Sequence, residues 1–211
     1  MERIRFHFDP RCPWCYQTSR WVRRIETLGE VEVDWGVFSL EVVNLPEGED
    51  PRTIDARSGP ILRTALALGD RKAIGRFYDA VGRRIWETAP PAAVDDLDAI
   101  RAALTEIGEE PALLDAALAE PATWDAVVTE HEALVARTRA FGVPTIVLDG
   151  GTGPAIFGPV ISRLPDDKEA VELWRHTSWL VRNDNFAELK RGRANTVDLP
   201  AVAWRTAQKA R

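Results

Sequence analysis

The stretch Asp9-Pro10-Arg11-Cys12-Pro13-Trp14-Cys15 decides how the rest of the sequence is interpreted. It holds both cysteines of the 211-residue chain and follows Ile4 to Phe8, a short run of alternating charged and apolar residues typical of a strand. A helical pattern begins directly after it, and Pro13 suits the first turn of that helix. Two cysteines three positions apart at a helix start can close into a small disulfide or open to a dithiol, so the stretch indicates redox chemistry.

The segments around this stretch predict an α/β, thioredoxin-like fold. Residues 13–28 have helical spacing and residues 31–39 are strand-like, so the first forty residues form a β-α-β unit. Residues 141–148 return to a strand pattern, with 149–151 as a turn and 155–157 as an antiparallel partner. Apolar residues between 171 and 181 supply a closing helix, and we expect a short extra helix around 186–191.

The middle of the chain is helical instead. Residues 44–60 are rich in proline, glycine and acidic side chains and indicate a loop. Apolar stripes then follow over 74–85, 94–107, 113–118 and 124–138, separated by proline-containing breaks. We therefore predict two units: residues 1–54 and 139–211 form the thioredoxin-like domain, and residues 55–138 form an inserted all-helical domain.

Composition narrows the class of protein. Hydrophobic residues make up 45% of the chain and charged residues 28%, which is typical of a soluble globular protein. The net charge of −6, without a clustered basic face, argues against a nucleic-acid partner. Charges near the N-terminus disfavour a signal peptide, and no apolar run approaches a membrane span. We expect a cytoplasmic protein without a membrane partner, as a monomer or homodimer.

The two cysteines are predicted to have different roles. The thiolate is the species that attacks a disulfide, and Cys12 occupies a helix N-terminus, where amide groups and the helix dipole favour an anion. Cys15 lies one turn deeper and should be less exposed, so Cys12 is the expected nucleophile and Cys15 the resolving thiol. Pro13 and Trp14 would set the redox poise and shape the rim of the site.

Two plainer interpretations of the pair remain. A tetrahedral zinc site would need two more ligands, and His7, His131, His176 and the carboxylates do not lie at metal-finger spacing, so no metal site is predicted. The pair could also have no chemistry at all.

A second candidate wall of the site is Val143-Pro144-Thr145. A thioredoxin fold places a cis-proline loop against its active cysteine, at a proline that begins a strand. Taken alone, Pro144 would more often follow an ordinary trans bond. Its place after Gly142 and after a helical insert favours the cis-proline loop.

Further strings accompany these two motifs: Thr18-Ser19-Arg20-Trp21, Ser39-Leu40, Phe157-Gly158-Pro159-Val160 and Phe186-x-Glu188-Leu189-Lys190-Arg191. With Cys12-Pro13-Trp14-Cys15 and Gly142-Val143-Pro144-Thr145, the chain resembles the DsbA family of thioredoxin-fold oxidoreductases and, within it, the actinobacterial mycothiol-dependent nitroreductases. The resemblance implies a DsbA-like fold and a Cys12 that exchanges with mycothiol as co-substrate. It also implies reduction of small electrophilic or disulfide substrates without a tightly bound cofactor. No Gly-rich dinucleotide fingerprint follows a strand.

Four other residues have open roles. Trp14 could stack on a substrate at the mouth of the site or simply be a packed aromatic. Asn44 could contact a ligand, although asparagine is equally a turn residue. His131 lies on an apolar helical stripe, where a core histidine is the commoner explanation, but it becomes a ligand contact if that face covers the cysteines. Asp9 ends the first strand and is a weaker candidate for a proton shuttle.

Two rival functions remain. The first is a protein disulfide oxidant or isomerase of the DsbA type, which the reduction potential would separate from a reductase. The second is a non-catalytic binding or chaperone-like module that uses a cleft between the two units.

Overall fold

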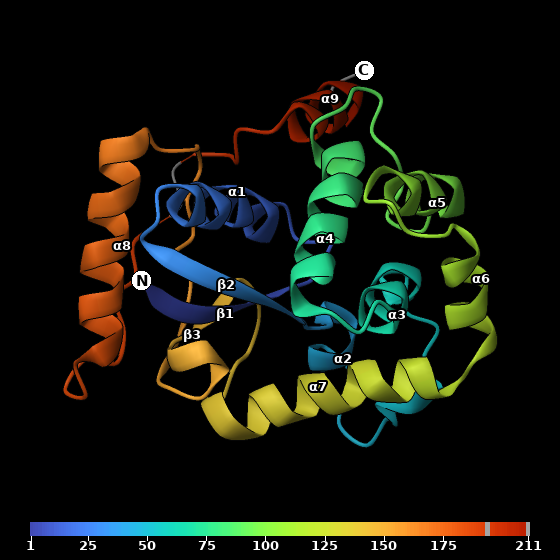
Figure 1. Ribbon diagram of the computed structural model, residues 1–211, viewed down its shortest axis with the longest axis horizontal. Helices are drawn as coiled ribbons and strands as arrows, with labels where there is room; N and C mark the ends of the chain where they lie inside the picture. Colours follow the sequence, from blue (N-terminus) through green and yellow to red (C-terminus); the bar gives the residue numbers. More distant parts are fainter. Residues whose placement is uncertain (193–194, 210–211) are drawn as a thin grey trace.

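A four-stranded sheet forms the centre of the fold in the computed structural model, which describes residues 1–192 and 195–209 (Figure 1). Its strand order is β2-β1-β3-β4. β1 (Glu2–Phe8) pairs in parallel with β2 (Val31–Val37) and antiparallel with β3 (Thr145–Val147), which pairs antiparallel with β4 (Ala155–Phe157). The predicted α/β fold, with a β-α-β half joined to a later antiparallel half, is confirmed.

Helix α1 (Pro13–Thr27) connects the two parallel strands and packs against α8 (Asp167–Arg182). Trp21 is fully buried between them, and its indole nitrogen donates to the carbonyl of Ala170 at 3.0 Å. The Trp174 ring lies 6.3 Å from the Trp21 ring. This packing fixes α1 against the sheet, so the position of its N-terminus, where the cysteines lie, is well defined.

The segment between β2 and β3 is helical and lies to one side of the sheet in Figure 1. Its elements are α2 (Leu40–Val43), a 3-10 turn (Pro51–Thr53), α3 (Gly59–Ala67), α4 (Arg71–Trp86), α5 (Leu97–Glu106), α6 (Ala112–Ala119) and α7 (Ala122–Thr138). Buried side chains of α3, α4 and α7 join the same hydrophobic core as the sheet. The inserted helices are therefore as predicted, while the division at residues 55 and 138 stays a prediction.

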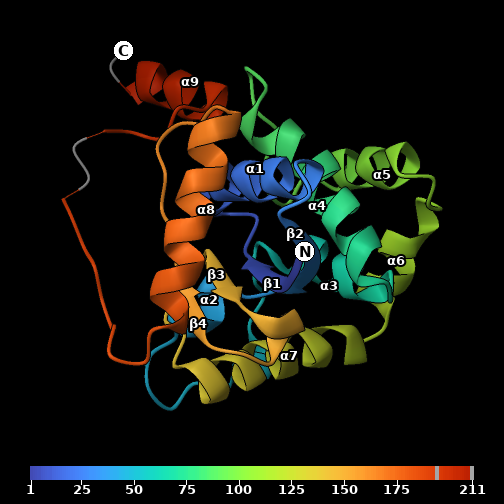
Figure 2. The same ribbon diagram turned by 60° about the vertical axis from the view of Figure 1, so that its left-hand side comes forward.

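The C-terminal segment differs from the prediction. The expected helix around 186–191 is wrong, because those residues have no regular secondary structure. A helix forms further on instead, α9 (Pro200–Lys209), which begins with a proline at a position that needs no amide donor. Figure 2 shows α9 near the end of α4, far from the strands. Residues 193–194 and 210–211 of the predicted tail lie outside the described residues.

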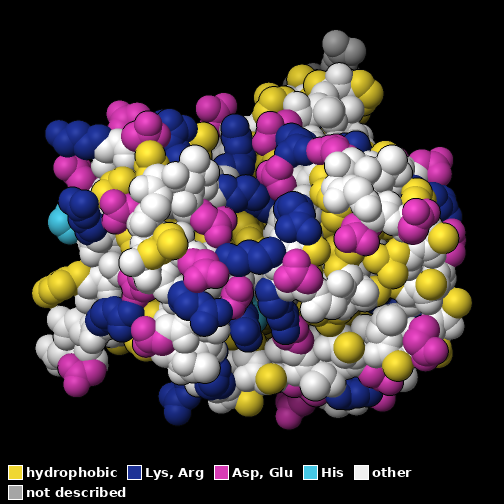
Figure 3. Space-filling view, viewed as in Figure 1, with side chains coloured by type: hydrophobic (Ala, Val, Ile, Leu, Met, Phe, Trp, Pro, Cys, Tyr) yellow, Lys and Arg dark blue, Asp and Glu magenta, His cyan; other side chains and the backbone are white. Residues whose placement is uncertain are grey.

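Charged side chains on the face shown in Figure 3 are interleaved, with acidic groups between the basic ones. Several of the basic groups are paired across elements. Arg71 of α4 lies 2.7 Å from Glu130 of α7, and Arg23 of α1 lies 3.4 Å from Asp79 of α4. These pairs tie the inserted helices to one another and to α1.

Candidate functional site

Cys12 is the N-cap of α1, and Pro13 is the first helical residue. The Cys12 sulfur accepts a hydrogen bond from the backbone N–H of Cys15 at 3.3 Å. The first turn of α1 contains no acidic side chain. The helix terminus therefore offers its amide groups and its positive dipole end to the sulfur, an arrangement that stabilises a thiolate there.

Cys15 differs from Cys12 in exposure. Cys12 is partly exposed, whereas Cys15 is completely buried, as expected from its place one turn deeper. The Cys15 thiol donates to the carbonyl of His7, with 3.8 Å between sulfur and oxygen. Burial raises the pKa of Cys15 well above its ordinary value, and the neighbouring Cys12 raises it further. The two thiols are thus distinguished: Cys12 is partly exposed at the helix N-terminus, whereas Cys15 is enclosed and its pKa is raised.

The Val143-Pro144-Thr145 loop lies against Cys12. The Val143–Pro144 peptide bond is cis, as predicted. The Cys12 sulfur lies 3.7 Å from the carbonyl oxygen of Val143. Thr145 is buried, and its hydroxyl donates to the carbonyl of Gly142 at 2.8 Å, so this side chain holds the loop instead of facing the cleft. The loop presents backbone groups to whatever is bound at Cys12.

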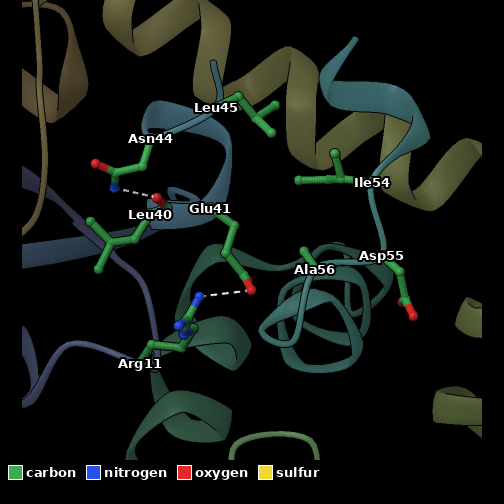
Figure 4. A pocket seen from close by; sticks show the side chains of 8 residues that line it. All are labelled: Arg11, Leu40, Glu41, Asn44, Leu45, Ile54, Asp55 and Ala56. Atoms are coloured by element: carbon green, nitrogen blue, oxygen red, sulfur yellow. Dashed lines mark hydrogen bonds and ion pairs between the residues drawn. The ribbon is translucent and has the colours of Figure 1, made fainter. Parts of the chain in front are cut away.

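A hollow of about 580 Å³ opens between α2 and the segment before α3 (Figure 4). Arg11 points into it and lies 2.7 Å from Glu41 of α2. Asn44 lines the same hollow, and its side-chain amide donates to the carbonyl of Leu40 at 2.6 Å. Among the lining residues Arg11 is the nearest to the dithiol along the chain, since it directly precedes Cys12, and the lining offers both hydrogen-bonding and apolar groups.

The remaining sequence candidates lie as follows. Trp14 is half-buried and packs against the hydrophobic core, which leaves both of its proposed roles possible. His131 is buried; its Nδ1 accepts from the backbone N–H of Ser39 at 3.3 Å, and its ring lies 4.2 Å from that of Phe38. Burial lowers the pKa of His131 to about 4. His131 is not among the residues lining the hollow, so its surroundings favour the core interpretation.

Asp9 is more deeply embedded in the site than its sequence position indicates. Its carboxylate is completely buried and accepts from the backbone N–H groups of Arg11 and Leu40, each at 2.7 Å. The Ser58 hydroxyl lies 3.5 Å from the same carboxylate. Burial raises the pKa of Asp9 to about 6, although both backbone hydrogen bonds oppose the shift. Asp9 thereby joins the cysteine loop to α2 and α3.

The described part of the chain was searched for metal-binding groups of side chains and for membrane-spanning helices. Within residues 1–192 and 195–209, no group of three or more histidine, cysteine, aspartate or glutamate side chains is placed to hold a metal ion. No described helix combines the length and the apolar character needed to cross a membrane.

The chain is similar in sequence to a curated protein and in fold to several solved structures. A curated Mycobacterium tuberculosis (strain ATCC 25618 / H37Rv) protein, the uncharacterized Rv2286c, is 35% identical over 200 residues, which cover 90% of this chain and 82% of the relative. Among solved structures, SCO1869 of Streptomyces coelicolor, described as a probable DsbA oxidoreductase, matches with a TM-score of 0.59 at 19% identity, over 92% of this chain and 95% of the other. The cytosolic disulfide reductase DsbM of Pseudomonas aeruginosa matches with a TM-score of 0.56 at 17% identity, over 84% and 99%.

The structural matches establish a DsbA-like thioredoxin fold. A family model described as mycothiol-dependent nitroreductase Rv2466c matches residues 11–191, a range that begins just before the Cys12–Cys15 pair and includes the cis-proline loop. The chain belongs to this Rv2466c-like family of mycothiol-dependent nitroreductases.

Proposed function

We propose that this protein is a cytoplasmic thiol–disulfide oxidoreductase that uses Cys12 and Cys15 to reduce small nitro or disulfide substrates, with mycothiol as its thiol co-substrate. The observation that carries this proposal is the position of the Cys12 sulfur. It lies between the N-terminus of α1 and the Val143 carbonyl, with Cys15 enclosed behind it. This is the arrangement that thiol exchange requires: an accessible attacking sulfur and a second sulfur within one helical turn.

For a disulfide substrate the steps balance without another cofactor. The Cys12 thiolate attacks one substrate sulfur and releases the other half as a thiolate. The Cys15 thiolate then attacks the Cys12 sulfur, which releases the second half and leaves a Cys12–Cys15 disulfide. One mycothiol thiolate attacks Cys12 and frees Cys15. A second attacks the bound mycothiol sulfur, which frees Cys12 and forms mycothiol disulfide.

Substrate and mycothiol would enter beside Arg11 and Asn44. The hollow lined by these residues offers a guanidinium and a side-chain amide, and its Arg11 directly precedes Cys12 in the sequence. Such groups suit the hydroxyl-rich body of a sugar-linked thiol as well as the oxygens of a nitro group. Val143 and Pro144 would align the incoming sulfur through backbone contacts, Trp14 would cover the mouth of the site, and Pro13 would fix the start of α1.

Turnover of a nitro substrate with mycothiol tests the proposal. We expect Cys12→Ser to abolish turnover, because serine supplies no thiolate. With a disulfide substrate and no added mycothiol, Cys15→Ser should stop at a Cys12 mixed disulfide, because no second thiol is present to resolve it. Parental turnover by Cys12→Ser would exclude Cys12 as the nucleophile. DsbM has also been solved with GSH, so glutathione is a suitable comparison thiol.

One observation favours a second candidate, a DsbA-type oxidant or isomerase of proteins. Phe141 is 68% exposed two residues before Val143, and its ring lies 4.8 Å from that of Phe157. This aromatic pair beside the cis-proline loop offers an apolar contact for a peptide chain. The reduction potential separates the candidates, since C-x-x-C enzymes range from roughly −270 mV for reductants to roughly −120 mV for oxidants.

A further inference from the structure

Helix α4 packs closely against β2 and α1, because two of its residues have no side chain. Gly75, Tyr78 and Gly82 share one face of α4, three and four residues apart. A Cβ at Gly75 would lie 2.3 Å from the Trp35 ring, and a Cβ at Gly82 would lie 2.3 Å from the Tyr16 ring. The two glycines therefore let the backbone of α4 contact β2 and α1 directly, and Tyr78 enters the core between them.

The Tyr78 ring is fixed from two sides. It stacks on Phe8 with 3.8 Å between ring centroids and 12° between planes, and it meets the edge of Tyr16 at 6.0 Å and 88°. Phe8 ends β1, and Tyr16 follows Cys15 directly, so the ring is held against the segment that carries the buried thiol. Tyr78 is completely buried, so its hydroxyl oxygen is enclosed in the core.

The hydroxyl of Tyr78 makes no hydrogen bond to another described residue in this conformation. Leaving a buried hydroxyl unbonded is costly, so such a group calls for an explanation. Burial raises the pKa of Cys15 overall, and Tyr78 acts in the opposite direction by favouring a negative charge on the Cys15 sulfur. The thiol proton of Cys15 is directed to the His7 carbonyl, which leaves the sulfur lone pairs as acceptors for Tyr78.

We propose that the Tyr78 hydroxyl donates a hydrogen bond to the Cys15 sulfur and stabilises the negative charge that this sulfur carries during thiol exchange. The inference rests on the proposed function and adds a catalytic group from the inserted helices. In the oxidative direction the Cys15 thiolate forms the bond to Cys12 while the thiolate bound to Cys12 departs. In the reductive direction an incoming thiolate bonds to Cys12, and Cys15 departs as the thiolate that Tyr78 stabilises.

Other charged groups face the same sulfur and set the background against which Tyr78 acts. The Asp9 carboxylate and Cys12 oppose a negative charge on Cys15, while the backbone N–H of Asp9 favours it. The Arg23 guanidinium lies 5.5 Å from the centre of the Tyr78 ring, and the Arg23 side chain is half-buried. None of these groups is altered when the Tyr78 hydroxyl alone is removed, so Tyr78→Phe isolates its contribution.

A two-phase reaction with the aromatic disulfide DTNB tests the proposal, since each phase releases one coloured thiolate. Attack by Cys12 gives the first phase and resolution by Cys15 gives the second. Loss of a hydrogen bond to a charged sulfur lowers the thiolate fraction about 10- to 100-fold. The more basic thiolate regains about 3- to 9-fold in nucleophilicity. We therefore expect Tyr78→Phe to slow the second phase about 3- to 10-fold between pH 6 and 8 and to leave the first unchanged.

Tyr16→Phe is the matched control, because the Tyr16 hydroxyl donates to Glu87 at 2.6 Å instead of facing a thiol. It should leave both phases at the parental rate. A spectroscopic measurement supports the kinetics: in a Cys12→Ser background, thiolate absorbance near 240 nm should appear at higher pH in Tyr78→Phe than with Tyr78 intact. An unchanged second phase in Tyr78→Phe, or equal slowing in Tyr16→Phe, would overturn the inference. A missing first phase in the parental protein would instead contradict the proposed role of Cys12.

Discussion

Replacing Asp9 with asparagine should change how the stability of the protein depends on pH. The carboxylate is completely buried beside the cysteine loop, and burial raises its pKa to about 6. The same group in the unfolded chain has a pKa of 3.8. Between these two values the unfolded chain has lost the Asp9 proton while the folded protein keeps it.

The sign follows from this difference in protons. The stability contributed by a group whose pKa is raised on folding is fully present below pH 3.8 and is lost as the pH rises through about 6. A shift of about two pKa units corresponds to about 3 kcal/mol in the free energy of unfolding. Asparagine does not titrate, so the Asp9→Asn variant lacks this loss. Its stability relative to the parental protein should therefore rise by about 3 kcal/mol from pH 4 to pH 7.

Urea unfolding of both proteins at half-unit steps from pH 4 to pH 7.5 measures the effect. Asparagine has one acceptor oxygen and an NH2 group that cannot accept, so one of the backbone N–H groups of Arg11 and Leu40 loses its acceptor. The variant should therefore also lose about 1–3 kcal/mol in the free energy of unfolding at every pH. Asp184→Asn removes an exposed carboxylate and controls for the change in net charge. If Asp9→Asn and the parental protein have parallel stability curves over this range, the inferred titration of Asp9 is refuted.

Three further predictions concern other parts of the structure. Burial lowers the pKa of His7 from 6.5 to about 4, so its contribution to stability is present above pH 6.5 and is lost on acidification. In urea unfolding, His7→Asn should therefore lose about 3 kcal/mol less stability between pH 7 and pH 4 than the parental protein, and equal losses in the two proteins would contradict this. Gly82→Ala places a methyl group against Tyr16 and should destabilise the protein by about 1–3 kcal/mol in urea unfolding. Gly192→Ala meets no atom of the described residues within 4 Å and should have little effect, so similar values for both would argue against the close approach of α4. Asn44→Ala removes an amide from the hollow and should raise the KM for mycothiol about 5-fold, with the first DTNB phase unchanged. An unchanged KM would show that Asn44 does not contact mycothiol.

Much of the fold could be predicted because the local sequence patterns each indicate one type of secondary structure and agree with one another. The alternation before Asp9, the helical spacing after Pro13 and the return to strand after Gly142 each have one simple interpretation, and all three agree with a thioredoxin-like fold. The C-terminal helix was misplaced because residues 186–191 are short and weakly periodic. The proline at position 200, which marks the helix start, was the more informative signal.

The site was predictable only in part, for a different reason. The motifs identify Cys12, Cys15 and Pro144, since their chemistry follows from spacing. Periodicity also places Tyr78 on an apolar helical face, but it cannot say which polar group of the core meets its hydroxyl. The same limit applies to Asp9, whose partners Leu40 and Ser58 are distant in the sequence.

Thiol–disulfide exchange between Cys12 and mycothiol is the central claim, and trapping the adduct tests it most directly. A Cys15→Ser variant cannot resolve the mixed disulfide, so it should accumulate one mycothiol per protein when treated with mycothiol disulfide. Intact mass and peptide mapping should place that adduct on Cys12, with a faster rate for mycothiol disulfide than for glutathione disulfide. If no adduct forms, or if the two disulfides react with Cys12 at equal rates, the proposed exchange with mycothiol is contradicted.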